Sequence, residues 1–161
     1  MIVTNTTPLI ALGKQGKINI LQLIFNKIIV PEAVFREIQY KSENPETLAV
    51  MAAIKEGWMN IEKASVKYLP DTLLLGEGEK EAISLAAHHR SIFLTDDKSA
   101  KSFALVQGIE SHGTLYVLTR AILKEIIAKE EARALLDKMI ASGFYVSINA
   151  YAGFIDALKE S

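Results

Sequence analysis

Five oxygen-bearing side chains are spaced along the chain so that they could act together on a divalent metal ion. They are one amide and four carboxylates: Asn5, Glu37, Glu79, Asp96 and Asp97. Carboxylates that converge repel one another and lose hydration, so such a cluster requires a cation. Oxygen ligands without Cys or His select Mg²⁺ or Mn²⁺ rather than zinc. A metal held in this way polarises a phosphoryl oxygen and lowers the pKa of a bound water, which favours phosphodiester hydrolysis.

The predicted secondary structure places these side chains at one edge of a sheet. Apolar, β-branched runs predict strands at 2–4, 28–30 and 91–95, with a further candidate at 58–61. Strands that alternate with helices imply right-handed crossovers and a mostly parallel sheet with helices on both faces. The predicted helices begin near Leu9, at Pro31 and after Gly78, and cover ranges 18–25, 47–55, 98–106, 114–123 and 129–140. A final segment that ends in 151–159 follows Gly143 and is assigned no element. Ligands bind at the carboxyl ends of the strands in such a sheet.

Each of the five side chains falls at or near this edge. Asn5 follows the first strand, and Asp96 and Asp97 follow a later one. Glu79 opens the helix that leads into that later strand, and Glu37 lies on a helix turn that can face the same crevice. We therefore expect residues that are far apart in the sequence to converge as a mostly acidic cluster.

Each feature also has an ordinary structural explanation. Asn5, followed by Thr-Thr-Pro, is typical of a helix N-cap. Glu79 stands near a helix start, where the macrodipole favours acids, and Asp96-Asp97 could cap the next helix. Glu37 alone would be a solvated residue on an amphipathic helix. The functional interpretation depends on the joint occurrence of these features.

Four segments, taken in order, resemble a PIN domain. They are Ile2–Ile10, Val30–Ile38, Gly76–Ile83 and Leu94–Asp97. The stretch from Gly76 to Leu118, with His112-Gly113-Thr114-Leu115 near its end, resembles most specifically an uncharacterised prokaryotic branch related to the toxin nucleases of type II toxin–antitoxin systems. The resemblance covers essentially the whole chain and implies one PIN-like α/β domain over residues 1–161.

The resemblance implies a role for each site residue. Acidic residues from four motifs share the metal in PIN domains, and the matching positions here are Asn5, Glu37, Glu79 and Asp97. Asp96 is a competing or supporting ligand, and Thr6 or Thr7 would hydrogen-bond neighbouring carboxylates or substrate phosphate. The implied reaction is attack of a metal-activated water on an RNA phosphodiester, with no covalent intermediate. The resemblance also implies a homodimer and a small antitoxin protein that inserts into the crevice.

The first motif departs from the PIN pattern, because Asn5 stands where an Asp is expected. An amide offers Mg²⁺ a carbonyl oxygen but no charge, and the number of charged ligands tunes affinity at oxygen-ligand sites. One alternative is therefore a degenerate PIN domain that binds RNA or a protein partner without cleavage. A weaker alternative is a phosphohydrolase that acts on small molecules.

Because the chain has little net charge, contacts to the substrate must come from individual basic residues near the site. The formal net charge is −1, so no global basic field points to nucleic acid. Lys98, Lys101 and Arg90 are the basic residues expected nearest the site, and Lys98 in particular could steady a phosphate. Each of them is also an ordinary solvated side chain.

Composition narrows the class of protein further. The chain contains no Cys, which excludes disulfides, thiolate nucleophiles and Cys-ligated zinc and fits a reducing cytoplasm. No apolar run reaches the roughly 18–20 residues that cross a bilayer, and the N-terminus lacks a signal-peptide pattern. Nucleotide-binding glycine loops and serine nucleophile elbows are absent from the sequence as well. We expect a cytoplasmic protein without a membrane partner.

Overall fold

The computed structural model describes residues 1–40, 43–65 and 75–160. This part of the chain contains one sheet in which each neighbouring pair of strands is parallel, in the order β3-β2-β1-β4-β5. The strands are β1 (Ile2–Thr4), β2 (Ile28–Pro31), β3 (Met59–Glu62), β4 (Ile92–Leu94) and β5 (Ser111–His112). The predicted α/β fold with a parallel central sheet is confirmed.

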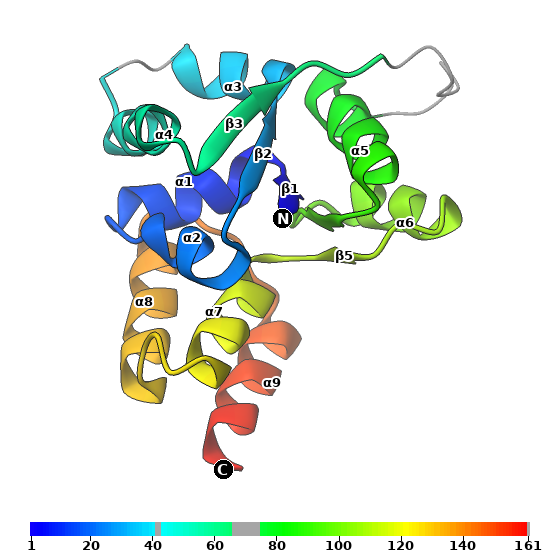
Figure 1. Cartoon of the computed structure of the whole chain (residues 1–161). Coiled ribbons are helices and arrows are strands. Elements are labelled where there is room, and N and C mark those ends of the chain that lie inside the picture. Colours follow the sequence, from blue (N-terminus) through cyan, green and yellow to red (C-terminus); the bar gives the residue numbers. More distant parts are fainter. Residues whose placement is uncertain (41–42, 66–74, 161) are drawn as a thin grey trace.

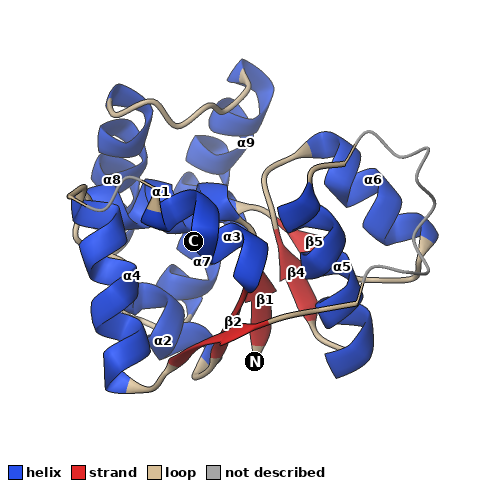
Figure 2. Cartoon of the chain, turned by 90° about the horizontal axis from the view of Figure 1, so that it is seen from above, coloured by secondary structure: helices blue, strands red, loops and turns tan. Residues whose placement is uncertain are grey.

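Helices connect and cover the strands (Figure 1). They are α1 (Thr6–Lys14), α2 (Asn19–Phe25), α3 (Glu32–Gln39), α4 (Pro45–Glu56), α5 (Glu77–His89), α6 (Lys98–Val106), α7 (Thr114–Leu123), α8 (Lys129–Ala141) and α9 (Ile148–Lys159). Seen from above, the strands lie between α5 and α6 on one side and α2, α4 and α8 on the other (Figure 2). None of the described helices has the length and apolar character needed to cross a membrane.

The core is divided by the sheet into two clusters, because successive strand residues point to opposite faces. Val3, Ile29 and Phe93 pack with the small and aliphatic residues of α5 and α6. Ile2 and Ile28 face the other way and pack with the larger set of helices, α1 to α4 and α7 to α9. Burial on both faces explains why the inner strands β1, β2 and β4 are almost entirely apolar rather than alternating with polar residues.

Two helices include a glycine that was expected to end or precede them. Gly13 lies inside α1, because α1 and α4 approach closely there, and a Cβ on Gly13 would lie 2.8 Å from the Cβ of Glu46. Gly78 lies inside α5, where a Cβ would lie 3.0 Å from Cγ2 of Val34 on α3. These two glycines therefore allow close helix packing instead of breaking the helix.

Other helix boundaries are moved by N-caps. The first helix begins at Thr6 rather than near Leu9, because the Asn5 side chain accepts a hydrogen bond from the Thr6 N–H at 2.8 Å. The final segment, for which no element is predicted, forms α9 from Ile148, and Ser147 Oγ caps it by accepting from Ala150 N at 3.1 Å. The predicted ranges 98–106 and 114–123 coincide with α6 and α7. No helix or strand is predicted from the sequence for residues 62–75, and most of this segment lies outside the described residues.

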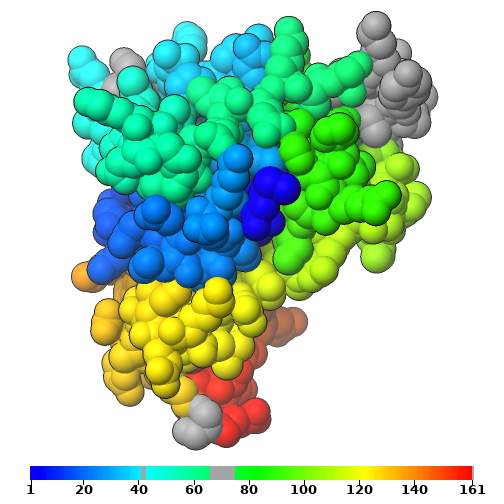
Figure 3. Space-filling model, viewed as in Figure 1, coloured from blue at the N-terminus to red at the C-terminus, as the bar shows by residue number. Residues whose placement is uncertain are grey.

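The C-terminal helices extend beyond the sheet, as the yellow-to-red part of the space-filling view shows (Figure 3). They pack on one another and on α1 and α2. Tyr151 on α9 donates a hydrogen bond to Asp137 Oδ1 on α8 at 2.7 Å. The same bond to a carboxylate raises the pKa of the Tyr151 hydroxyl. The turn between α8 and α9 is held at the end of α1, where Lys14 Nζ donates to the Ser142 carbonyl at 3.1 Å.

Candidate active site at the carboxyl edge of the sheet

The central strands β1 and β4 bring the first and last motifs together. Thr4 is the register partner of Leu94, and the Asn5 N–H donates to the Leu94 carbonyl at 2.8 Å. Asn5 Nδ2 also donates to Thr95 Oγ1 at 3.2 Å, and this oxygen accepts a second hydrogen bond from Asp97 N at 3.2 Å. The buried Thr95 hydroxyl therefore joins Asn5 to Asp97.

Asp97 has one carboxylate oxygen engaged and one open. Its Oδ1 accepts a hydrogen bond from Ala100 N at 2.7 Å, so Asp97 is the N-cap of α6. Among the described residues, Oδ2 accepts no hydrogen bond. The capping explanation and the ligand explanation of Asp97 are therefore compatible, because each uses a different oxygen.

Asp96 is bound on both oxygens to the start of α7. Its Oδ1 accepts from Thr114 N at 2.8 Å, and its Oδ2 accepts from Thr114 Oγ1 at 2.6 Å. A Cβ on Gly113 would lie only 2.6 Å from Asp96 Oδ1 and 3.1 Å from Lys101 Nζ. Asp96 thus ties the end of β4 to α7, and this contact requires a glycine at position 113.

Glu37 on α3 meets the beginning of α1. Thr6 Oγ1 donates a hydrogen bond to Glu37 Oε2 at 2.8 Å. The other oxygen, Oε1, faces α5 and lies 3.1 Å from where a Cβ on Gly78 would stand. The absence of a side chain at Gly78 leaves Glu37 room to reach the first turn of α5.

Glu79 lies in that first turn of α5 but folds back on its own helix. One of its oxygens, Oε2, accepts a short hydrogen bond from the Gly76 N–H. This bond satisfies one of the donors that helix N-termini leave unpaired. Glu79 follows Gly78, the residue beside which Glu37 lies. Within the described residues, Glu79 makes no hydrogen bond to another predicted ligand.

Glu81 is a positioning residue that the sequence did not single out. It is only 3% exposed, and its Oε2 accepts a hydrogen bond from Ala33 N at 3.0 Å. Ala33 is in the first turn of α3, where the helix macrodipole favours a negative charge. Glu81 therefore fixes α3, which carries Glu37, against α5. An acid directly before the apolar pair Ala82-Ile83 was the available sequence signal.

The basic residues divide between the two edges of the sheet. Lys98 is exposed at the start of α6, next to Asp97, and Lys101 lies beside Gly113. Arg90 instead precedes Ser91 at the amino end of β4, so it is at the opposite edge. The expectation that Arg90 lies near the site is wrong, because a residue before a parallel strand cannot reach the end where the strand finishes.

The residues suit a hard divalent ion in donor chemistry, although they do not surround one point. Across the three described ranges, no three His, Asp or Glu side chains form a group ready to hold a metal. Three carboxylates nevertheless keep an oxygen that accepts no hydrogen bond from any described residue, namely Glu37 Oε1, Glu79 Oε1 and Asp97 Oδ2. Carboxylates without a cation repel one another and turn to nearby N–H and O–H donors. These oxygens are the ligand type that Mg²⁺ and Mn²⁺ prefer.

The comparisons with known proteins concern the family and the fold of the chain. A PIN-domain family, DUF3368, matches residues 1–160. A PilT N-terminus domain protein from the archaeon Sulfolobus solfataricus has a similar structure, with a TM-score of 0.56 and 19% identity over 76% of this chain and 94% of that chain. A domain of a functionally unknown protein from Methanocaldococcus jannaschii matches at a TM-score of 0.46 and 22% identity over 70% and 89% of the two chains. The search of curated proteins gave no match. Because the family match spans nearly its whole length, the chain belongs to this PIN-domain family.

Proposed function

We propose that this chain is a divalent-metal-dependent endoribonuclease that hydrolyses RNA phosphodiesters. PIN domains are generally nucleases, so membership of the family supports the reaction class. The observation that carries the proposal is that three carboxylates at the carboxyl edge of the sheet keep a free oxygen each. These belong to Glu37, Glu79 and Asp97, which come from three different motifs of the PIN pattern.

Glu37, Glu79 and Asp97 would hold Mg²⁺ or Mn²⁺ through their free oxygens. An ion bound there would place positive charge beside the phosphate and would make hydroxide available from a bound water near neutral pH. Asp96 is less suited as a ligand than Asp97, because both of its oxygens already accept from Thr114. Its proposed role is to position α7.

Neighbouring polar groups would orient the carboxylates and the RNA. Thr6 holds Glu37 by a hydrogen bond from its hydroxyl. Thr7 is exposed one residue further along, and Lys98 is exposed beside Asp97. In the proposal, Thr7 and Lys98 would bind phosphate oxygens of the RNA, because their donors are accessible to a substrate.

Asn5 supports a second candidate, a PIN domain that binds RNA or a protein without cutting. Its Oδ1 accepts from Thr6 N and its Nδ2 donates to Thr95 Oγ1. Both polar groups of this buried amide thus serve the structure, and the amide carries no charge toward a metal. The three remaining carboxylates favour the metal-dependent nuclease over this second candidate, because together they still attract a divalent cation.

The test is cleavage of a mixed single-stranded RNA in Mn²⁺ or Mg²⁺ by the wild type, Glu79→Gln and Asn5→Asp. Glu77→Gln is the matched control, because Glu77 lies in the same helix turn and forms only an exposed ion pair with Arg36 at 3.6 Å. The proposal expects cutting by the wild type and by Glu77→Gln that is lost in Glu79→Gln. A wild type that stays inert while Asn5→Asp cuts would establish the non-cleaving candidate. Activity on free phosphoesters alone would favour a small-molecule phosphohydrolase.

The same proposal includes the partners that the sequence motifs imply. The chain would be the nuclease of a toxin–antitoxin pair, would form a homodimer and would be inhibited by a small antitoxin that enters the crevice. Its support is the order of the four motifs and the family match. Growth arrest on expression that a neighbouring small gene relieves would support the pairing, and light scattering of the purified chain would measure its oligomeric state.

A further inference from the structure

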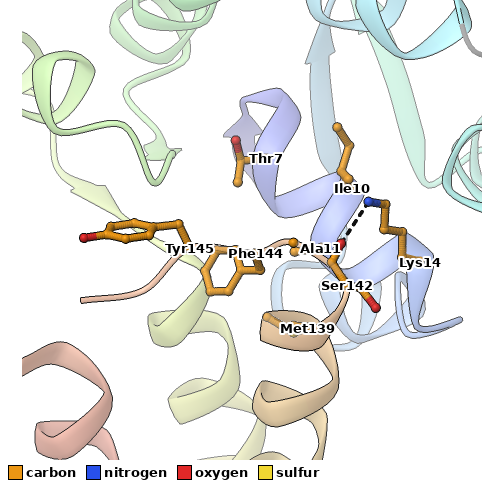
Figure 4. A pocket seen from close by; sticks show the side chains of 9 residues that line it. Thr7, Ile10, Ala11, Lys14, Met139, Ser142, Phe144 and Tyr145 are labelled. Atoms are coloured by element: carbon orange, nitrogen blue, oxygen red, sulfur yellow. Dashed lines mark hydrogen bonds between the residues drawn. The ribbon is translucent and has the colours of Figure 1, made fainter. Parts of the chain in front are cut away.

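A pocket of about 280 Å³ lies between α1 and the turn that follows α8 (Figure 4). Its walls are mainly apolar, with a hydroxyl and an ammonium group on the α1 side. The apolar residues are Ile10, Ala11, Met139, Phe144 and Tyr145, and the polar groups belong to Thr7 and Lys14. The metal-binding proposal uses none of these residues except Thr7.

The pocket and the candidate active site both involve the first turn of α1. Thr7 lines the pocket, and the preceding residue, Thr6, donates its hydroxyl hydrogen bond to Glu37. Because neighbouring residues of one helix turn carry both contacts, the pocket lies close to Glu37. A polymer with a phosphate at the site can therefore reach the pocket with an adjoining unit.

Hydrogen bonds fix the turn after α8. Gly143 has a φ of 106°, and the N–H of Phe144 donates to the Met139 carbonyl at 2.9 Å. Lys14 Nζ on α1 donates to the Ser142 carbonyl at 3.1 Å, the contact dashed in Figure 4. The pocket is thus a preformed feature of the fold.

The aromatic residues are arranged for a flat, apolar ligand. Phe144 is half-buried next to the fully buried Met139, whereas the Tyr145 side chain is 81% exposed. Aromatic side chains that stay accessible beside an apolar floor are stacking platforms for bases in proteins that bind single-stranded nucleic acid. The pocket volume accommodates one ring system rather than a helix or a strand of a protein.

The charge beside the pocket suits a nucleotide. The Lys14 ammonium has three N–H donors, and one of them is used by Ser142. The other two Lys14 donors are available to an anion. They provide a local positive charge, although the formal net charge of the chain is −1. A cation beside an aromatic pocket matches the alternation of base and phosphate along RNA.

We propose that this pocket binds one unpaired base of single-stranded RNA next to the scissile phosphate. Tyr145 and Phe144 contact the base, and Lys14 binds the adjoining phosphate. The substrate class rests on the proposed function, whereas the base-binding role is a property of the pocket alone. The enzyme consequently selects single-stranded RNA over a duplex, whose bases are already stacked and paired.

The test measures RNA binding without cleavage. Fluorescence anisotropy of an end-labelled single-stranded RNA, in Ca²⁺ in place of Mn²⁺, compares the wild type with Tyr145→Ala, Tyr145→Phe and Ile148→Ala. Ile148 is the control, because it is 87% exposed and close in sequence but does not line the pocket. A duplex of the same sequence is measured in parallel.

Tyr145→Ala should weaken binding of single-stranded RNA by about tenfold, as expected for the loss of one stacked base. Tyr145→Phe and Ile148→Ala should bind like the wild type, and the duplex should not distinguish the variants. The assignment would be overturned if Tyr145→Ala bound RNA as tightly as the wild type, or if the wild type did not bind RNA. In either case a side chain of a protein partner would be the better candidate for the pocket. RNA that is bound in this way but never cut in Mn²⁺ would contradict the nuclease proposal and leave the pocket assignment intact.

Discussion

At the scale of single residues, hydroxyl groups organise the candidate site. Thr95 accepts from both Asn5 and Asp97, and Thr6 donates to Glu37. Neutral donors and acceptors of this kind hold carboxylates in place without adding charge, which leaves the ionic interactions for a metal and a phosphate. Thr114 does the same for Asp96 through its hydroxyl and its N–H.

Thr95→Val should therefore destabilise the fold and impair the site. Valine has nearly the same shape but no oxygen, so the buried Asn5 amide and the Asp97 N–H each lose an acceptor. An unpaired buried polar group costs about 1–3 kcal/mol of unfolding free energy. Denaturant unfolding measures this loss, with Thr119→Val as the control, because the Thr119 hydroxyl bonds only the Leu115 carbonyl on an exposed helix face. Equal stability of the two variants would contradict the role given to Thr95.

Restoring a carboxylate at position 5 by Asn5→Asp should leave the fold intact. Aspartate keeps the acceptor that caps α1, and the Thr95 hydroxyl can turn to donate to it while still accepting from Asp97 N. The fold should therefore tolerate Asn5→Asp, whatever its effect on metal binding. This tolerance makes the variant a fair test of activity in the cleavage assay.

At the scale of elements, close helix packing brings the motifs into one place. Gly13 lets α1 cross α4, and Gly78 lets α5 approach α3. Glu81 adds a buried hydrogen bond between α5 and the first turn of α3. The position of Glu37 thus depends on residues that have no part in the chemistry.

Gly13→Ala should destabilise the protein by about 1–3 kcal/mol, the usual cost of overpacking. The added Cβ would meet the Cβ and Cα of Glu46 at 2.8 and 2.9 Å, and a Cα cannot be turned aside as a flexible side chain can. Gly153→Ala in α9 is the matched control, because nothing lies within 4 Å of its added Cβ and alanine is the better helix former. Thermal unfolding should move down in the first variant and stay or move up in the second. A Gly13→Ala protein as stable as wild type would mean that this crossing is loosely packed.

The elements also show how far a sequence predicts this protein. Apolar strand runs and the ends of α6 and α7 could be predicted, because they follow local propensity and capping. Gly13 and Gly78 could not be, since a glycine that breaks a helix and one that admits a neighbouring helix look the same in sequence. The meeting of Asn5 with the 95–97 segment could be expected, because the carboxyl ends of parallel strands lie at one edge of the sheet. The engagement of both Asp96 oxygens by Thr114 did not, because that contact depends on the path of α7.

At the scale of the whole molecule, folding brings carboxylates from three motifs to one edge of the sheet. The unfolded chain separates them, so an ion that binds the folded state alone stabilises it by mass action. A concentration of Mn²⁺ at 100 times its dissociation constant should add about 2.7 kcal/mol. For a chain of 161 residues, this corresponds to a rise in Tm of about 5–10 °C.

A thermal-shift titration with Mn²⁺ or Mg²⁺ measures this effect at constant ionic strength. Glu37→Gln should respond less than the wild type, because it loses a charged ligand but can still accept from Thr6. Glu32→Gln is its control on the same helix, since Glu32 makes only a long ion pair with Lys63 at 4.0 Å. A Tm that does not depend on the divalent ion would contradict the metal site.

The most direct measurement is the rate of RNA cleavage as a function of Mn²⁺ concentration in the wild type and in Asp97→Asn. Asparagine caps helices as well as aspartate does, so the bond from Ala100 N and the fold should persist while one ligand charge is lost. We expect the half-saturating Mn²⁺ concentration to rise, or the maximal rate to fall, by at least about tenfold, the cost of losing even an outer partner of a metal ligand. An Asp97→Asn protein that cuts RNA with the rate and Mn²⁺ dependence of the wild type would contradict the metal-dependent mechanism.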